Sequence, residues 1–155
     1  MHLTMQAIGW SLDYKRFRIY LKEKFHVTTA NYFIGYIQWN KKLYMNLESY
    51  GYTMIYRPTH PIRGEGYKGN CDVELVLNTM INIDNFDKAV LVTSDGDFSS
   101  LVTYLIDKDK LERVLVPNKE HCSRLLRKAA GSKIDYIENL RVKLELEGRE
   151  APRED

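Results

Sequence analysis

The chain has 155 residues, of which 44% are hydrophobic and 28% charged, and its formal net charge is +2. This size predicts one domain that needs no disulfide to fold, and the small net charge leaves any nucleic-acid binding to local basic patches. No apolar run reaches the roughly 18 residues of a membrane-spanning helix, and the start lacks a signal-peptide pattern. With Cys71 and Cys122 and no C-x-x-C pair, we expect reduced thiols in a cytoplasmic protein.

Apolar spacing, capping residues and turn residues divide the chain into alternating helices and strands. In chain order they predict the end of a helix at 2–8, a helix at 13–24, a strand at 26–36, a helix at 39–50, a strand at 53–56, a mobile loop at 57–69, a helix from 70 or 71 to 80, a strand at 88–93, a helix at 98–107, a strand at 111–116, a helix at 120–130, an edge strand at 134–137 and a helix at 139–146. This alternation predicts a three-layer α/β fold with a parallel sheet and right-handed crossovers. We expect one domain over residues 1–147 and a polar, disordered tail over 148–155.

Two carboxylates, Asp95 and Asp97, follow the strand predicted at 88–93 and are separated by Gly96. Ligands of open α/β sheets bind at the carboxyl ends of the strands, and Gly96 allows a sharp turn and the close approach of a ligand. Asp72 opens the preceding helix, whose N-terminus lies at the same edge. We therefore expect Asp72, Asp95 and Asp97 to converge as catalytic and metal-ligating residues for Mg²⁺ or Mn²⁺.

Each acid also has a purely structural interpretation. Asp97 is equally well placed as the N-cap of the next helix. Asp95 could instead be a turn residue. Asp72 could merely complement the dipole of its helix, and Glu74 is a weaker candidate for the cluster.

Basic and hydroxyl residues surround the predicted acidic edge. The loop at 57–69 carries cations for a nucleic-acid backbone, although a solvated loop is an equally good interpretation. Thr93 and Ser94 could bind a phosphate or orient Asp95. The candidate substrate-binding residues are Arg57, Arg63, Lys68, Thr93, Ser94 and Ser123.

Two segments, Lys68–Leu75 and Val90–Phe98, resemble the NYN domains of the PIN-like nuclease superfamily, and the LabA-like branch most of all. The stretches Gly9–Leu21 and Ser123–Ala130 are similar to helices of the same family. The resemblance implies a Rossmann-like, PIN-like α/β/α sandwich and a cytoplasmic, metal-dependent ribonuclease, a hydrolase that binds RNA, single-stranded or structured. It also implies Mg²⁺ or Mn²⁺ at clustered aspartates, three of which Asp72, Asp95 and Asp97 match.

The sequence departs from the family at its start and at Asn78, where an aspartate is common. The family opens with a central strand ending in an Asp-Gly-x-Asn type motif, and this chain starts just after it. Either the sequence has a late start, or the protein lacks both the central strand and the first acidic ligand. The neighbouring strands would then have unpaired edges, which a homodimer could cover.

Three other functions are alternatives to a ribonuclease. A catalytically degenerate module that binds RNA or a protein is the main one, because the first acid would be missing if the chain lacks its first strand. A phosphatase of the D-x-D type places its acid pair after the first strand, not deep in the chain. A dinucleotide-binding enzyme is disfavoured because no G-x-G-x-x-G follows a strand.

Overall fold

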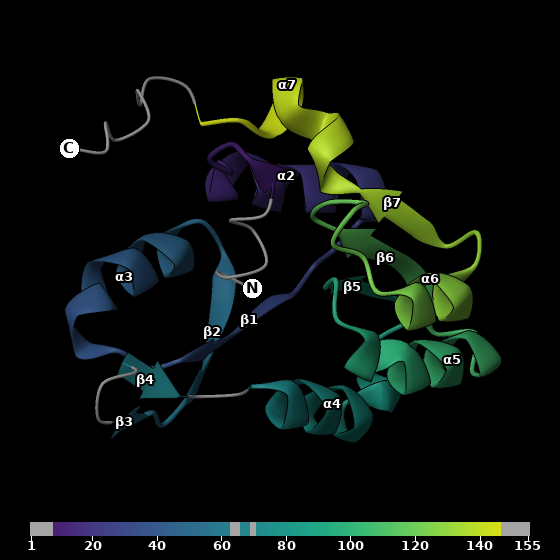
Figure 1. Ribbon diagram of the computed structural model, residues 1–155, viewed down its shortest axis with the longest axis horizontal. Coiled ribbons are helices and arrows are strands. Elements are labelled where there is room, and N and C mark those ends of the chain that lie inside the picture. The colour runs from purple at the N-terminus through teal and green to yellow at the C-terminus, as the bar shows by residue number, and fades with distance from the viewer. Residues whose placement is uncertain (1–7, 63–65, 69–70, 147–155) are drawn as a thin grey trace.

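The computed structural model describes residues 8–62, 66–68 and 71–146, and for 60–62 and 66–68 it describes the backbone alone. Two parallel sheets dominate this part of the chain (Figure 1). One pairs β1 (Ala30–Gly35) with β2 (Tyr52–Arg57). The other has the order β5 (Ala89–Val92), β6 (Leu111–Val116), β7 (Ile134–Tyr136). The parallel α/β class predicted from the alternation of elements is confirmed.

Helices connect these strands as expected. The α-helices are α2 (Tyr14–Phe25), α3 (Lys41–Ser49), α4 (Asp72–Ile81), α5 (Ser99–Asp107), α6 (Arg124–Ala130) and α7 (Arg141–Leu144). Short 3-10 turns precede or follow them: η2 (Gln38–Asn40), η3 (Ile83–Asn85), η4 (Gly96–Phe98) and η5 (Ile137–Leu140). The start of α2 follows from the sequence, because the carboxylate of Asp13 accepts a hydrogen bond from the Arg16 N–H at 3.0 Å.

Helices cover both faces of the β5–β6–β7 sheet (Figure 1). On β6, Val114 and Val116 pack into a core shared with α5 and α6, whereas Leu115 between them packs into a core shared with α2 and α7. Successive strand residues point to opposite faces, so this alternation shows three layers. All three side chains are fully buried.

A third core lies between the β1–β2 sheet and α3. It contains Tyr32 of β1, Leu47 of α3 and Tyr52 of β2. Tyr14 of α2 packs against both this core and the α2–α7 core. The Tyr52 hydroxyl also donates a hydrogen bond to the Tyr14 carbonyl at 2.8 Å, so α2 joins the two sheets.

Several boundaries differ from the sequence prediction. The loop expected at 57–69 contains a short antiparallel hairpin, β3 (His60–Ile62) with β4 (Gly66–Lys68). The helix expected from residue 120 begins at Arg124, because the side chain of Ser123 caps it. The helix end expected at 2–8, apart from Ile8, and the tail expected at 148–155 lie outside the described residues.

Candidate metal centre

The structure brings the three aspartates together. One carboxylate oxygen from each of Asp72, Asp95 and Asp97 lies within 4.8 Å of the others. Asp72 is the first residue of α4, Asp95 follows the carboxyl end of β5, and Asp97 lies in η4. Asp72 is half-buried, whereas Asp95 and Asp97 are exposed, so the cluster opens to solvent. We call these three residues the acidic cluster.

Two hydrogen bonds fix the turn that carries Asp95 and Asp97. The hydroxyl of Thr93, a residue only 6% exposed, accepts a bond from the Asp95 N–H at 3.1 Å. The Asp95 carboxylate accepts one from the Asp97 N–H at 2.9 Å and so caps η4. The capping role considered for Asp97 thus falls to Asp95, and Phe98, not Asp97, occupies the N-cap position of α5. Thr93 therefore holds the backbone of the turn at Asp95.

Gly96 lies against Ser123 at close range. A Cβ added to Gly96 would lie 2.3 Å from the Ser123 Oγ, a distance that real Cβ atoms essentially never show. Ser123 is held in place by its own bonds: its N–H donates to the Ser94 carbonyl at 3.1 Å, and its Oγ accepts from the Leu125 N–H at 3.2 Å. Ser94 and Ser123 therefore contact each other through the backbone, beside the acidic cluster.

The basic residues expected at the site are only partly described. Arg57, at the end of β2, forms an ion pair with Glu74 at 3.0 Å, with both side chains about one third exposed. Glu74 is not among the clustered carboxylates. Lys68 lies in β4, where only the backbone is described, and Arg63 lies outside the described residues.

The thiol of Cys71 directly precedes α4 and the acids of its first turn. Burial, and then the carboxylates of Glu74 and Asp72, raise the pKa of the Cys71 thiol above its usual value. Cys71 therefore stays a neutral thiol at physiological pH and is poorly suited to act as a nucleophile.

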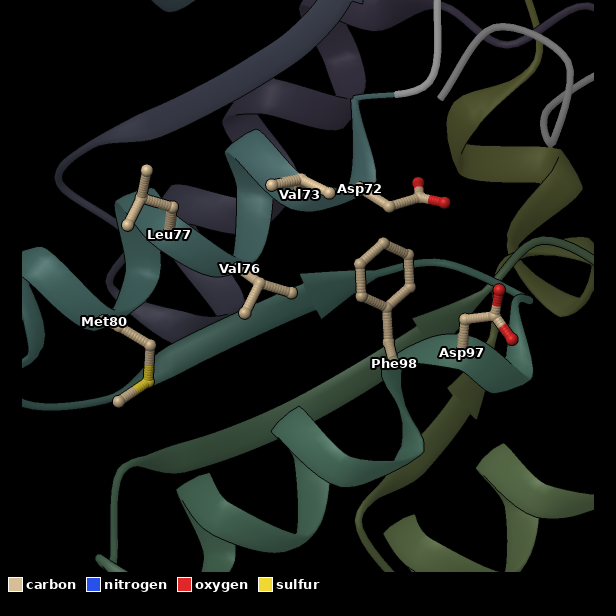
Figure 2. Close-up of a pocket in the computed structure, with 7 residues that line it drawn as sticks. All are labelled: Asp72, Val73, Val76, Leu77, Met80, Asp97 and Phe98. Atoms are coloured by element: carbon tan, nitrogen blue, oxygen red, sulfur yellow. The ribbon is translucent and has the colours of Figure 1, made fainter.

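An apolar groove adjoins the acidic cluster and was not predicted from the sequence. Its cavity of about 440 Å³ is lined by Asp72, Val73, Val76, Leu77, Met80, Asp97 and Phe98. Figure 2 shows the two carboxylates on one side of the Phe98 ring and the aliphatic side chains of α4 on the other. The sequence does carry one signal, because Val73 and Leu77 are spaced four residues apart on a helix and share one face.

The donor set suits a hard divalent cation. All three candidate ligands are carboxylate oxygens, and among the described residues no histidine or cysteine belongs to the cluster. Mg²⁺ and Mn²⁺ prefer oxygen ligands and bind through few carboxylates, with water and substrate phosphate completing the coordination. The acidic cluster could therefore hold a metal ion, with Asp72, Asp95 and Asp97 as its protein ligands.

Together, the parallel sheet, its covering helices and the acidic cluster at the strand ends define an α/β protein of the Rossmann-like, PIN-like type. The NYN domain model matches residues 1–138, and the chain belongs to that family. NYN domains form a PIN-like nuclease family and generally act on RNA.

A solved structure supports the fold independently. The crystal structure of a protein of unknown function from Vibrio parahaemolyticus RIMD 2210633 superposes with a TM-score of 0.70 at 23% sequence identity. The match covers 88% of this chain and 85% of that one. No curated protein sequence gives a significant match. Among the described residues, no helix has the length and apolar character needed to cross a bilayer.

Proposed function

We propose that this NYN domain is a metal-dependent ribonuclease that hydrolyses phosphodiester bonds of RNA at the acidic cluster. The observation that carries this proposal is the convergence of Asp72, Asp95 and Asp97 to within 4.8 Å. Membership of the NYN family supports RNA as the substrate. Three carboxylates this close repel one another, so a bound cation would stabilise their arrangement.

The chain's own residues would act by positioning. Asp72, Asp95 and Asp97 would hold Mg²⁺ or Mn²⁺, while Thr93 holds the turn that presents Asp95. The bound ion supplies Lewis-acid chemistry, neutralising phosphodiester charge and favouring ionisation of water at the site. The proposed contacts for the RNA backbone are Arg57, Arg63, Lys68, Thr93, Ser94 and Ser123.

Asp95→Asn tests the proposal with little risk to the fold, because the amide oxygen of asparagine can still accept the bond from the Asp97 N–H. Asp107→Asn is a matched control, because Asp107 is an exposed acid at the far end of α5. Mn²⁺ affinity would be measured by calorimetry, and cleavage on a varied panel of RNAs with Mn²⁺ or Mg²⁺.

We expect Asp95→Asn to weaken Mn²⁺ binding by at least the roughly 10- to 100-fold that loss of an outer-shell partner costs, and to abolish cleavage. Asp107→Asn should behave as the wild-type protein. No cleavage of any RNA by the wild-type protein would refute the proposal. If RNA also stayed bound in EDTA and to Asp95→Asn, the non-catalytic binding module would replace it.

A further inference from the structure

The acidic cluster and the apolar groove are one continuous surface. Asp72 and Asp97 belong to both, since each is a clustered carboxylate and each lines the groove. The groove runs from these acids along α4, and the buried Phe98 ring forms its inner wall (Figure 2). A ligand bound at the cluster would therefore have the groove directly beside it.

The chemistry of the groove is uniform. Beyond the two carboxylates, the described lining consists of Val73, Val76, Leu77, Met80 and Phe98, none of which has a side-chain hydrogen-bond donor or strong acceptor. Val73 and Leu77 remain 66% and 56% exposed although both are large and apolar. A cavity of about 440 Å³ lies within the roughly 300–1,000 Å³ typical of small-molecule sites.

We propose that this groove holds an unpaired nucleobase of the RNA, that of the nucleotide next to the phosphate at the acidic cluster. This inference rests on the proposed ribonuclease function and adds the orientation of its substrate. Such a nucleotide has the two properties that the surface requires: an anionic phosphate for a cation at the cluster, and a flat base whose apolar faces can pack in the groove.

Two consequences for the substrate follow from this placement. A base enters the groove only when it leaves the stack of a duplex, so the cleaved position is single-stranded or unpaired. Because the described lining beyond Asp72 and Asp97 lacks hydrogen-bonding groups that read base edges, the groove distinguishes bases mainly by size. Purines, with the larger apolar face, are preferred over pyrimidines at this position.

A second copy of the chain is the competing occupant. Val73, Leu77 and Ile81 form an exposed apolar stripe on α4, with Ile81 69% exposed. A helix packing against this stripe would cover all three residues. The nucleobase, in contrast, would contact Leu77 but not Ile81, which lies one turn further along and does not line the groove. This difference provides a matched pair of variants.

The experiment compares Leu77→Gln with Ile81→Gln in the full chain. A short fluorescent oligoribonucleotide with one cleavage site serves as substrate, and a second carries an abasic nucleotide next to that site. Cleavage rates at low RNA concentration are measured in Mn²⁺, and RNA binding is measured by fluorescence anisotropy in Ca²⁺, which also takes oxygen ligands. Mn²⁺ affinity and molar mass by light scattering are recorded for each variant.

We expect Leu77→Gln to lower both cleavage and binding of the intact RNA by about tenfold, within the range of losing one stacked base. Ile81→Gln should leave both unchanged, and neither variant should alter Mn²⁺ affinity. The abasic nucleotide should weaken wild-type binding by a similar factor but change Leu77→Gln little, because the contact is already lost.

The possible outcomes distinguish failure of the groove proposal from failure of the proposed nuclease function. If Leu77→Gln matches the wild-type protein while Asp95→Asn is inactive, the groove proposal fails and the ribonuclease stands. If both stripe variants convert a dimer to a monomer, the stripe binds a second copy and the groove proposal fails. If RNA binds with the expected pattern but is never cleaved, the ribonuclease fails, and the groove is then a base-binding site of a non-catalytic module. If the wild-type protein does not bind RNA, both fail.

Discussion

Replacing Gly96 with alanine should disturb the acidic cluster from within the fold. Gly96 lies between Asp95 and Asp97, and its backbone is outside the left-handed region, so the substitution causes no strain in φ. The substitution is unfavourable because the structure leaves no room for an added methyl group. The new Cβ would lie 2.3 Å from the Ser123 Oγ and 3.1 Å from the Ser123 Cβ, and both distances are too short. Either Ser123 or the turn between the two aspartates must move.

The cost can be estimated from what Ser123 would lose. Over-packing at a well-packed contact typically costs about 1–3 kcal/mol. Rotating the Ser123 hydroxyl away would also remove its bond from the Leu125 N–H, the cap of α6, at a cost of about 1 kcal/mol. We therefore expect Gly96→Ala to lower the free energy of unfolding by about 2–4 kcal/mol and to weaken Mn²⁺ binding.

A double-mutant cycle with Ser123→Gly provides the decisive assay. Ser123→Gly removes both atoms that clash, and by itself it should cost only a few tenths of a kcal/mol. In denaturant unfolding, the double variant should be more stable than the sum of the single effects by about 1 kcal/mol or more. Mn²⁺ affinity should recover in parallel. Additive effects, or Mn²⁺ binding that stays weak in the double variant, would refute the assignment of Gly96 to this contact.

Three further predictions concern the surroundings of the site and the tyrosine core. Thr93→Val removes the acceptor for the Asp95 N–H and should cost about 1–2 kcal/mol of unfolding free energy in denaturant titrations; no change would mean that water replaces the bond. Glu74→Gln removes the negative charge paired with Arg57 and should raise RNA affinity in anisotropy measurements while costing less than about 1 kcal/mol of stability; unchanged RNA affinity would argue against Arg57 as a contact. Burial, then neighbouring tyrosines, raise the pKa of Tyr32, so the native state keeps a proton that the unfolded chain loses above about pH 10, and stability should fall there by about 1.4 kcal/mol per pH unit. Tyr32→Phe should reduce this alkaline slope, and an identical slope in both proteins would contradict the argument.

The convergence of the acids could be predicted from the sequence because it follows from topology. Asp95 ends a strand whose apolar residues identify it, and Asp72 opens the helix that leads into that strand. In an α/β sheet both positions lie at the same edge. The order of the elements along the chain and the amino-acid types at these positions were sufficient to predict this convergence, without any interatomic distance.

Contacts between distant segments could not be predicted in the same way. Gly96 and Ser123 lie in two loops that follow different strands. No local pattern in either loop indicates that these two residues are in contact. The β3–β4 hairpin was missed because each strand has three residues within a stretch rich in proline and glycine, too short to show an alternating pattern. The groove depends on how α4 lies against η4, which side-chain packing decides.

The separation of the two parallel sheets has a consequence for motion. No backbone hydrogen bond joins β1–β2 to β5–β6–β7 within the described residues, so packing around Tyr14 couples them. Such an arrangement favours subglobal opening, in which β1, β2 and α3 exchange their amide hydrogens together while β6, enclosed by helices on both faces, stays protected. The half of the molecule that carries the aspartates could then remain ordered while the other half opens and closes.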